Sequence, residues 1–148
     1  MSNPRVVEVQ LNRRYRFMYV NFAVLTQGMT YLFLEKLGDT VFALRFAGSN
    51  CKYGGPNDEA HGAHPLAKFG LGFYGFYEVH DSPWIREMMV ANRIHPRHSD
   101  SMFDGLRHFI ACFKDVKFEC VCREMSEVQL SCAEISELLA QQIGYLEE

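Results

Sequence analysis

Runs of β-forming residues separated by glycine turns fill the first third of the chain. The runs cover residues 6–11, 16–25, 29–36 and 40–47, and Gln27-Gly28 and Gly38-Asp39 separate the last three. Glycine supplies the positive φ that tight hairpin turns require, so the pattern predicts a meander of antiparallel strands. Residues 17–25 are largely apolar on both faces. We therefore expect helices to cover one side and a second sheet layer or a second subunit to cover the other.

Residues 48–70 show no hydrophobic period and are rich in glycine, with two prolines and two histidines. This composition predicts a long polar loop. Loops of more than about 12 to 15 residues inside a compact domain are commonly functional or mobile. We therefore expect this loop to contribute to the functional site.

An aromatic strand over residues 71–80 and a capped helix are predicted next. Ser82 provides the N-cap hydroxyl, and Pro83 occupies the first helical position, where it is well tolerated. The buried stripe of this helix comprises Ile85, Met88 and Met89. The helix should end before His95-Pro96, because a residue that precedes proline is pushed out of the helical region.

The last third of the chain predicts a hairpin and a C-terminal helix. Residues 101–104 form one short turn, and residues 106–113 and 117–123 form the hairpin strands. In the helix, which runs from Ser131 to about Tyr145, Ser131 and Glu134 make a capping box. The whole chain, residues 1–148, reads as one α+β domain. Its mainly antiparallel sheet of about six to seven strands is covered by two helices.

Composition adds an unusual share of aromatic residues and excludes some classes of protein. Aromatic residues make up 14% of the chain, and such rings need a thick core, a ligand cavity or a partner surface. A net charge of −3 argues against a protein that binds nucleic acid by neutralising phosphates. A local basic patch stays open at the amino end, where several arginines face one acid, Glu8. These arginines are Arg5, Arg13, Arg14 and Arg16.

The five cysteines are an odd number, and the chain starts without a basic segment followed by an apolar one. Both features favour reduced thiols and a cytoplasmic protein. No apolar run approaches the roughly 20 residues that span a bilayer, so no membrane segment is expected. Cys120 and Cys122 share one face of a strand beside Cys112, which would permit a thiolate metal site. Their apolar neighbours favour buried core cysteines instead.

Five histidines in loops or at element ends are candidate ligands for a transition metal. They are His61, His64, His95, His98 and His108. With Asp58 or Glu59 they could bind Zn or Fe, or one of them could act as a general acid or base. Neither histidine pair spaced by three residues lies in a helical H-E-x-x-H context, and such pairs arise often by chance. Loop-tip or capping roles are therefore favoured, and no cofactor is predicted.

The leading hypothesis is a small binding module whose ligand is a small molecule or a peptide. An aromatic strand beside a long polar loop can make an apolar pocket with a few polar anchors. In this interpretation Tyr74, Phe76, Tyr77 and Trp84 are walls, and Asn57, Asp58, His64 and His98 orient the ligand. The second hypothesis is a metal-dependent or general-base enzyme, against which the sequence leans. The third is an interaction protein with an aromatic interface, and a homodimer is expected.

Four segments together resemble a family of small bacterial proteins that occur as orphan reading frames in chromosomes and in integron gene cassettes. The segments are GGPNDEAHGAHPL at 54–66, GLGFYGFYEVHDSPWI at 70–85, HPRH at 95–98 and LRHFIACFKDVKFECV at 106–121. The resemblance implies a bacterial, cytoplasmic protein and brings no activity with it. It also implies that the histidine loop, the start of the tryptophan helix and the last hairpin belong together.

Overall fold

Two pairs of successive strands link the two sheets of the molecule. In the computed structural model, β4 (Thr40–Ala47) leads into β5 (Asn50–Gly54), and β8 (Lys117–Cys122) leads into β9 (Glu124–Ser131). β4 pairs with β9 in one sheet, and β5 pairs with β8 in the other. At this junction the amide of Arg123 donates to the carbonyl of Ala47 at 2.9 Å. This bond keeps the two chain segments paired where they pass from one sheet to the other.

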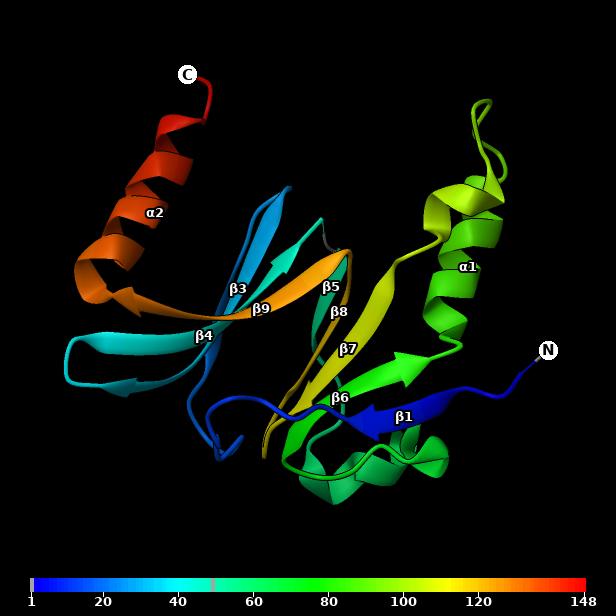
Figure 1. The fold of residues 1–148 in the computed structure, drawn as a ribbon, viewed down its shortest axis with the longest axis horizontal. Coiled ribbons are helices and arrows are strands. Elements are labelled where there is room, and N and C mark those ends of the chain that lie inside the picture. The colour runs from blue at the N-terminus through cyan, green and yellow to red at the C-terminus, as the bar shows by residue number, and fades with distance from the viewer. Residues whose placement is uncertain (1, 49) are drawn as a thin grey trace.

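The described residues, 2–48 and 50–148, form an α+β fold of two antiparallel sheets with helices outside them (Figure 1). Sheet A has the strand order β1-β6-β7-β8-β5, and sheet B has the order β2-β3-β4-β9. The remaining strands are β1 (Arg5–Glu8), β2 (Phe22–Leu25), β3 (Met29–Leu37), β6 (Gly75–His80) and β7 (Arg107–Cys112).

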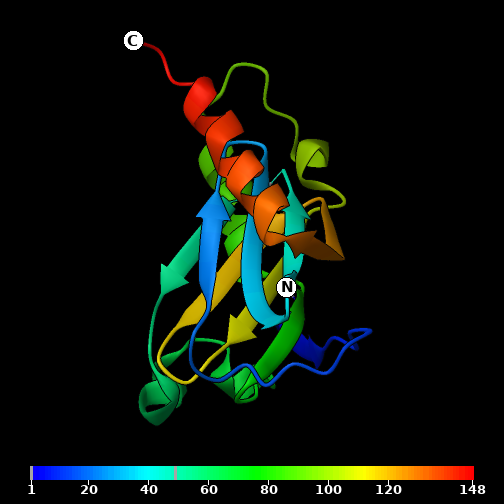
Figure 2. The same cartoon turned by 90° about the vertical axis from the view of Figure 1, so that its left-hand side faces the viewer.

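Helices lie on the outer side of each sheet. α1 (Pro83–Asn92) lies beside sheet A together with the short 3-10 helices η1 (Asp58–Ala63) and η2 (Ala67–Phe69), and η3 (Asp100–Phe103) follows α1. α2 (Cys132–Gly144) crosses in front of sheet B in Figure 2. The molecule is therefore layered, with a helix outside each sheet and the main core between the sheets.

An aromatic core fills the space between the two sheets. Phe46 comes from sheet B, whereas Phe76, Phe109 and Phe118 come from sheet A, and all four are almost fully buried. The rings of Phe76 and Phe109 stack with centroids 5.3 Å apart, and Phe46 tilts onto Phe118 at 5.4 Å. Aromatic contacts of this kind stabilise a core beyond the area they bury. Part of the excess of aromatic residues therefore serves the hydrophobic core.

The N-terminal arc, residues 9–21, crosses from β1 in sheet A to β2 in sheet B and closes one end of the sandwich. The amide of Val9 donates to the carbonyl of Phe76, and the amide of Lys114 donates to the carbonyl of Met18, each at 2.9 Å. Between these anchors Phe17 inserts its buried ring beside Phe76. Phe17 has a φ of 50°, which is uncommon for a bulky residue and prevents a regular strand here.

The fold class, both hairpin turns and the positions of both helices agree with the sequence predictions, but the predicted buried stripe of α1 (Ile85, Met88 and Met89) is only half-buried. Gly38 turns the β3–β4 hairpin with a φ of 60°. The hydroxyl of Ser82 accepts a hydrogen bond from the amide of Ile85 at the start of α1. Ser131 and Glu134 form the complete capping box of α2. The hairpin of β7 and β8 and the turn at η3 are also present.

Several strand predictions were wrong, and the described residues contain nine strands rather than six or seven. β1 does not join the meander, because it pairs with β6 in sheet A. Residues 16–21 belong to the arc. Part of the predicted loop forms β5, an edge strand whose polar residues obscure the alternation of apolar and polar positions. Residue 49 of that loop lies outside the described residues. β9 was missed because only Arg123 separates it from β8.

We expect Phe46→Ala to lower the free energy of unfolding by about 3 to 5 kcal/mol, because it opens a cavity where three aromatic rings meet. Urea unfolding followed by circular dichroism measures this change. Ile94→Ala is the control, since Ile94 is 92% exposed and its loss should cost less than about 0.5 kcal/mol. Equal effects of the two substitutions would contradict the assignment of the core.

Candidate functional site

The residues predicted to bind a ligand do not surround one cavity. Phe76 and Tyr77 are successive residues of β6, so their side chains point to opposite faces of sheet A. Phe76 lies in the core between the sheets, whereas Tyr77 packs in the second core beneath η1 and η2. His98 follows α1, where its ring is hydrogen-bonded to Asn92 and Asp100. It lies apart from the other predicted ligand residues.

Asn57, Asp58 and Tyr74 do come together. The side chain of Asn57 caps η1 by accepting a hydrogen bond from the amide of Ala60 at 3.0 Å. Asp58 accepts hydrogen bonds from the hydroxyl of Tyr74 and from Nζ of Lys114. The hydrogen bond from Tyr74, supported by Lys114, lowers the pKa of Asp58. These contacts fix the half-exposed ring of Tyr74 at the end of sheet A.

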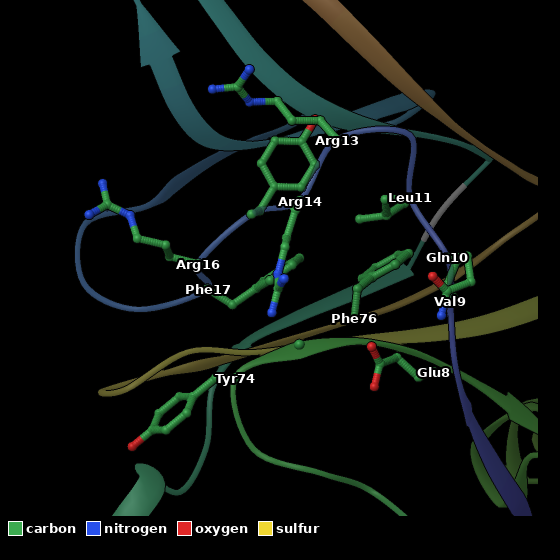
Figure 3. Close-up of a pocket in the computed structure, with 12 residues that line it drawn as sticks. Glu8, Val9, Gln10, Leu11, Arg13, Arg14, Arg16, Phe17, Tyr74 and Phe76 are labelled. Carbon is green, nitrogen blue, oxygen red and sulfur yellow. The ribbon is translucent and has the colours of Figure 1, made fainter.

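A cavity of about 690 Å³ lies between the N-terminal arc and the start of β6, and we call it the arc pocket. Figure 3 shows the rings of Phe17 and Phe76 facing it, with Tyr74 at its edge. Among the described residues, the non-glycine positions with positive φ are Phe17, Tyr74 and Asp81, and the first two line this pocket. Backbone strain of this kind clusters at ligand sites.

Three arginines of the arc and one acid, Glu8, line the pocket, so the charge of its lining is positive on balance. The guanidinium of Arg13 stacks 4.0 Å from the centroid of the Phe42 ring and lies 4.0 Å from Glu35. The exposed side chain of Arg14 has no hydrogen-bond or ion-pair partner within residues 2–48 and 50–148. Figure 3 shows the guanidinium of Arg14 pointing into the cavity and that of Arg16 pointing outward. Arg14 can therefore bind an anion in the pocket through two parallel N–H groups.

A second candidate site is a chain of hydrogen-bonded polar side chains on the outer face of sheet A. Oγ of Ser82 lies 2.8 Å from Nδ1 of His108, and Nε2 of His108 lies 3.0 Å from one oxygen of Glu119. Nε2 of His64 lies 2.7 Å from the other oxygen of Glu119. We call these four residues the polar chain. It joins the segment after η1, the start of α1, and the β7–β8 hairpin, which are the segments that the sequence resemblance groups together.

Glu119 is the acid at the centre of the polar chain. Burial raises the pKa of Glu119, but the hydrogen bonds from His108 and His64 outweigh burial and lower it to about 2. The carboxylate is therefore ionised at neutral pH and only accepts hydrogen bonds. A buried carboxylate with two imidazole donors is a stable anion.

Trp84 and Lys52 flank the polar chain. The indole of Trp84 meets the ring of His108 edge to face at a centroid distance of 5.3 Å. Nζ of Lys52 lies 4.1 Å from the centroid of the Trp84 ring, in reach of a cation–π attraction. Trp84, which the sequence proposed as a pocket wall, thus lies beside the polar chain and away from the arc pocket.

The histidines of the metal hypothesis do not gather around one point. His61 bonds to the carbonyl of Leu71 at 2.8 Å and stacks on Phe73, while His95 is exposed. Within the described chain, no group of three or more histidine, cysteine, aspartate or glutamate side chains could hold a metal ion.

His64 is also a poor metal ligand for a chemical reason. Its Nδ1 accepts a hydrogen bond from the amide of Leu66 at 3.1 Å, so in the neutral ring the proton sits on Nε2. That nitrogen donates to Glu119 and has no lone pair for a metal.

The cysteines fall on two sides of sheet A. Cys120 and Cys122 lie in the core between the sheets, and Cys112 lies in the core on the outer face. Burial raises the pKa of Cys112 to about 12, so its thiol stays protonated at neutral pH. These three residues are buried core cysteines, as the apolar neighbours suggest.

α2 leaves part of its apolar surface exposed. Leu139 and Ile143 are accessible, as is Leu146 just after the helix. A groove of about 530 Å³ lies between the start of α2 and sheet B, with Phe22 and Phe33 in its lining. Such a face can serve an interface. The expected homodimer stays a prediction.

Comparisons with family models, with curated proteins and with solved structures gave no match. In the part of the chain that the structure describes, no helix is long and apolar enough to cross a membrane. Function is therefore inferred from the chemistry of the arc pocket and the polar chain.

Several residues of these sites, Phe17 among them, were missing from the predicted ligand and metal sets. Ser82 was recognised only as a helix cap, and Arg14 only as one member of a basic segment. Glu119 offered the clearest signal, since it is a single acid among the apolar and cysteine residues Phe118 to Cys122. A charge at such a position is rarely buried without a partner.

We expect Glu119 to stabilise the fold above about pH 4.5 and to lose this effect as the pH falls toward 2, because its pKa is lowered in the folded state. The full shift corresponds to about 3 kcal/mol. Glu119→Gln mimics the protonated acid. The gap in unfolding free energy between the wild type and this variant should therefore close as the pH falls from 5 to 2.

Urea unfolding across this range measures the gap. Glu124→Gln, at an exposed position of β9, is the matched control and should open no gap at any pH. A wild-type advantage over Glu119→Gln that stays constant with pH would show that the carboxylate charge is not what stabilises the polar chain.

Proposed function

We propose that the protein binds a small organic anion with a flat apolar part in the arc pocket. The observation that carries this proposal is the unpaired guanidinium of Arg14, which points into the cavity. Within residues 2–48 and 50–148 this guanidinium has no ion-pair partner, so the fold gains little from its charge. It is well suited to a carboxylate, phosphate or sulfonate group.

The size of the cavity supports a small ligand. Ligand pockets commonly have volumes of about 300 to 1,000 Å³ and combine apolar walls with a few polar groups. The arc pocket has about 690 Å³. Tyr74 gives an accessible aromatic side, the buried rings of Phe17 and Phe76 lie behind the lining, and Arg14 provides the charge. A flat apolar group would lie against the ring of Tyr74 while its anionic group reaches Arg14.

The anchoring of Tyr74 supports a preformed site. Its hydroxyl donates to Asp58, and this hydrogen bond raises the pKa of Tyr74, so the hydroxyl remains a donor at neutral pH. Lys114 holds the same carboxylate at 3.3 Å. A ring fixed before the ligand arrives loses little conformational entropy on binding, which favours affinity.

We expect phenyl phosphate to bind and Arg14→Gln to weaken its binding by about tenfold or more, because a hydrogen bond to a charged group contributes about 1.5 to 3 kcal/mol. Isothermal titration calorimetry at low and moderate salt measures the affinity. Binding should weaken as salt rises, since the pocket is open to solvent.

Arg97→Gln is the matched control, because Arg97 is an exposed arginine far from the pocket lining. It removes the same net charge and should leave the affinity unchanged. Benzyl alcohol, a neutral ligand with the same ring, should bind much more weakly than phenyl phosphate. Equal losses in the Arg14 and Arg97 variants, or equal binding of the two ligands, would overturn the proposal.

A further inference from the structure

The polar chain has only one arrangement of protons when its histidines are neutral. The ionised Glu119 only accepts hydrogen bonds, so Nε2 of His108 must carry the proton that faces it. Nδ1 of His108 is then unprotonated and accepts from the hydroxyl of Ser82, 2.8 Å away. A serine hydroxyl that donates to an imidazole, whose other nitrogen donates to a carboxylate, is the arrangement that activates a serine for nucleophilic attack.

His64 completes this arrangement from the far side of Glu119. Its Nδ1 accepts from the amide of Leu66, which fixes the proton on Nε2 and directs it at the second oxygen of Glu119. The carboxylate therefore cannot rotate away from His108 without losing a hydrogen bond. His64 and Glu119 act as positioning residues, because they hold the orientation and tautomer of the imidazole.

Ser82 lies at a strained junction between a strand and a helix. Asp81, between β6 and α1, has a φ of 54°, and this backbone turn places Ser82 at the N-cap of α1. The Ser82 hydroxyl accepts from the amide of Ile85 at 3.2 Å, so its own proton is free to go to His108. Pro83 has no N–H, which leaves the amide of Trp84 as the first donor of the helix without an intrahelical partner.

An open cleft of about 430 Å³ has Ser82 in its lining. Ile85, Met89, Phe103 and Leu106 give it an apolar side, which fits a short acyl or benzyl group. Ser82 itself is 7% exposed, so a reactant reaches it through this cleft. The cleft lies at the opposite end of β6 from the arc pocket, whose lining includes Gly75 and Phe76.

We propose that Ser82 is the nucleophile of an acyl-transfer site that hydrolyses small esters with an apolar acyl group. Oγ of Ser82 attacks the carbonyl carbon, its proton passes to Nδ1 of His108, and the amide of Trp84 faces the oxyanion. The carbon–oxygen bond to the alcohol then breaks, and the alcohol leaves with the proton from His108. Water, deprotonated by His108, hydrolyses the acyl-serine and restores the hydroxyl.

The first test uses phenylmethanesulfonyl fluoride, which forms a sulfonyl ester with an activated serine and releases fluoride. Intact-protein mass spectrometry and peptide mapping should find one adduct, on Ser82. Ser131 is the matched control within the same chain, since it caps α2 in the same way and no histidine of the described residues bonds to it. Ser82→Asn, which retains an N-cap side chain, should give no adduct and keep the wild-type circular dichroism spectrum.

The second test separates catalysis from structure. His108→Gln should slow both labelling and the hydrolysis of p-nitrophenyl butyrate by about 100-fold or more, the usual effect of a general base. Glu119→Gln should slow labelling and move the midpoint of its pH profile to lower pH, because no carboxylate then stabilises the charged imidazole. Arg97→Gln, at an exposed arginine outside the lining of the arc pocket and of the Ser82 cleft, should label like the wild type.

The absence of a Ser82 adduct in folded wild-type protein would overturn the proposal. Labelling of Ser82 at equal rates in the wild type and in a folded His108→Gln variant would also overturn it, because the imidazole would then not activate the hydroxyl.

Discussion

Burial of the phenylalanine rings between the two sheets is the constraint on which the rest of the structure depends. It commits one face of β6, β7 and β8 to the core, so every alternate residue of these strands must point outward. The outward set includes Tyr77, Ile110, His108 and Glu119, and its apolar members still need a cover. The segments around η1, η2 and α1 provide that cover, and the polar chain fastens them to the sheet.

Strand β6 connects the two candidate sites. Tyr74 precedes it and Asp81 follows it, and both have positive φ. Strand pairing requires neither positive φ, because Tyr74 and Asp81 both lie just outside the paired residues of β6. Each one instead turns the chain so that a side chain reaches a site: the ring of Tyr74 at the arc pocket and the hydroxyl of Ser82 at His108. The positive φ at both ends of β6 is therefore better explained by the two candidate sites than by the needs of the sheet.

The sequence predicts local features of this fold well, because caps and turns depend on neighbouring residues. The caps at Ser82 and Ser131 and the turn at Gly38 are of this kind. The arc was missed because Tyr15 and Phe17 have β-forming side chains, and only their packing between the sheets determines their backbone. The bond from Ser82 to His108 and those to Glu119 join residues that are distant in sequence, so no local pattern reveals them.

The ionised Glu119 stabilises the fold, but a purely structural contact between these segments could be made without a buried charge. Replacing a buried ionic group by well-packed apolar residues is often neutral or stabilising, because the desolvation of a carboxylate can cost more than its pairing returns. Here burial opposes ionisation, and two histidines are needed to offset it. The same outward face of sheet A accommodates Tyr77, Val79 and Ile110 without such compensation. What an ionised Glu119 adds, and an apolar residue cannot, is a fixed imidazole tautomer with a basic nitrogen directed at Ser82.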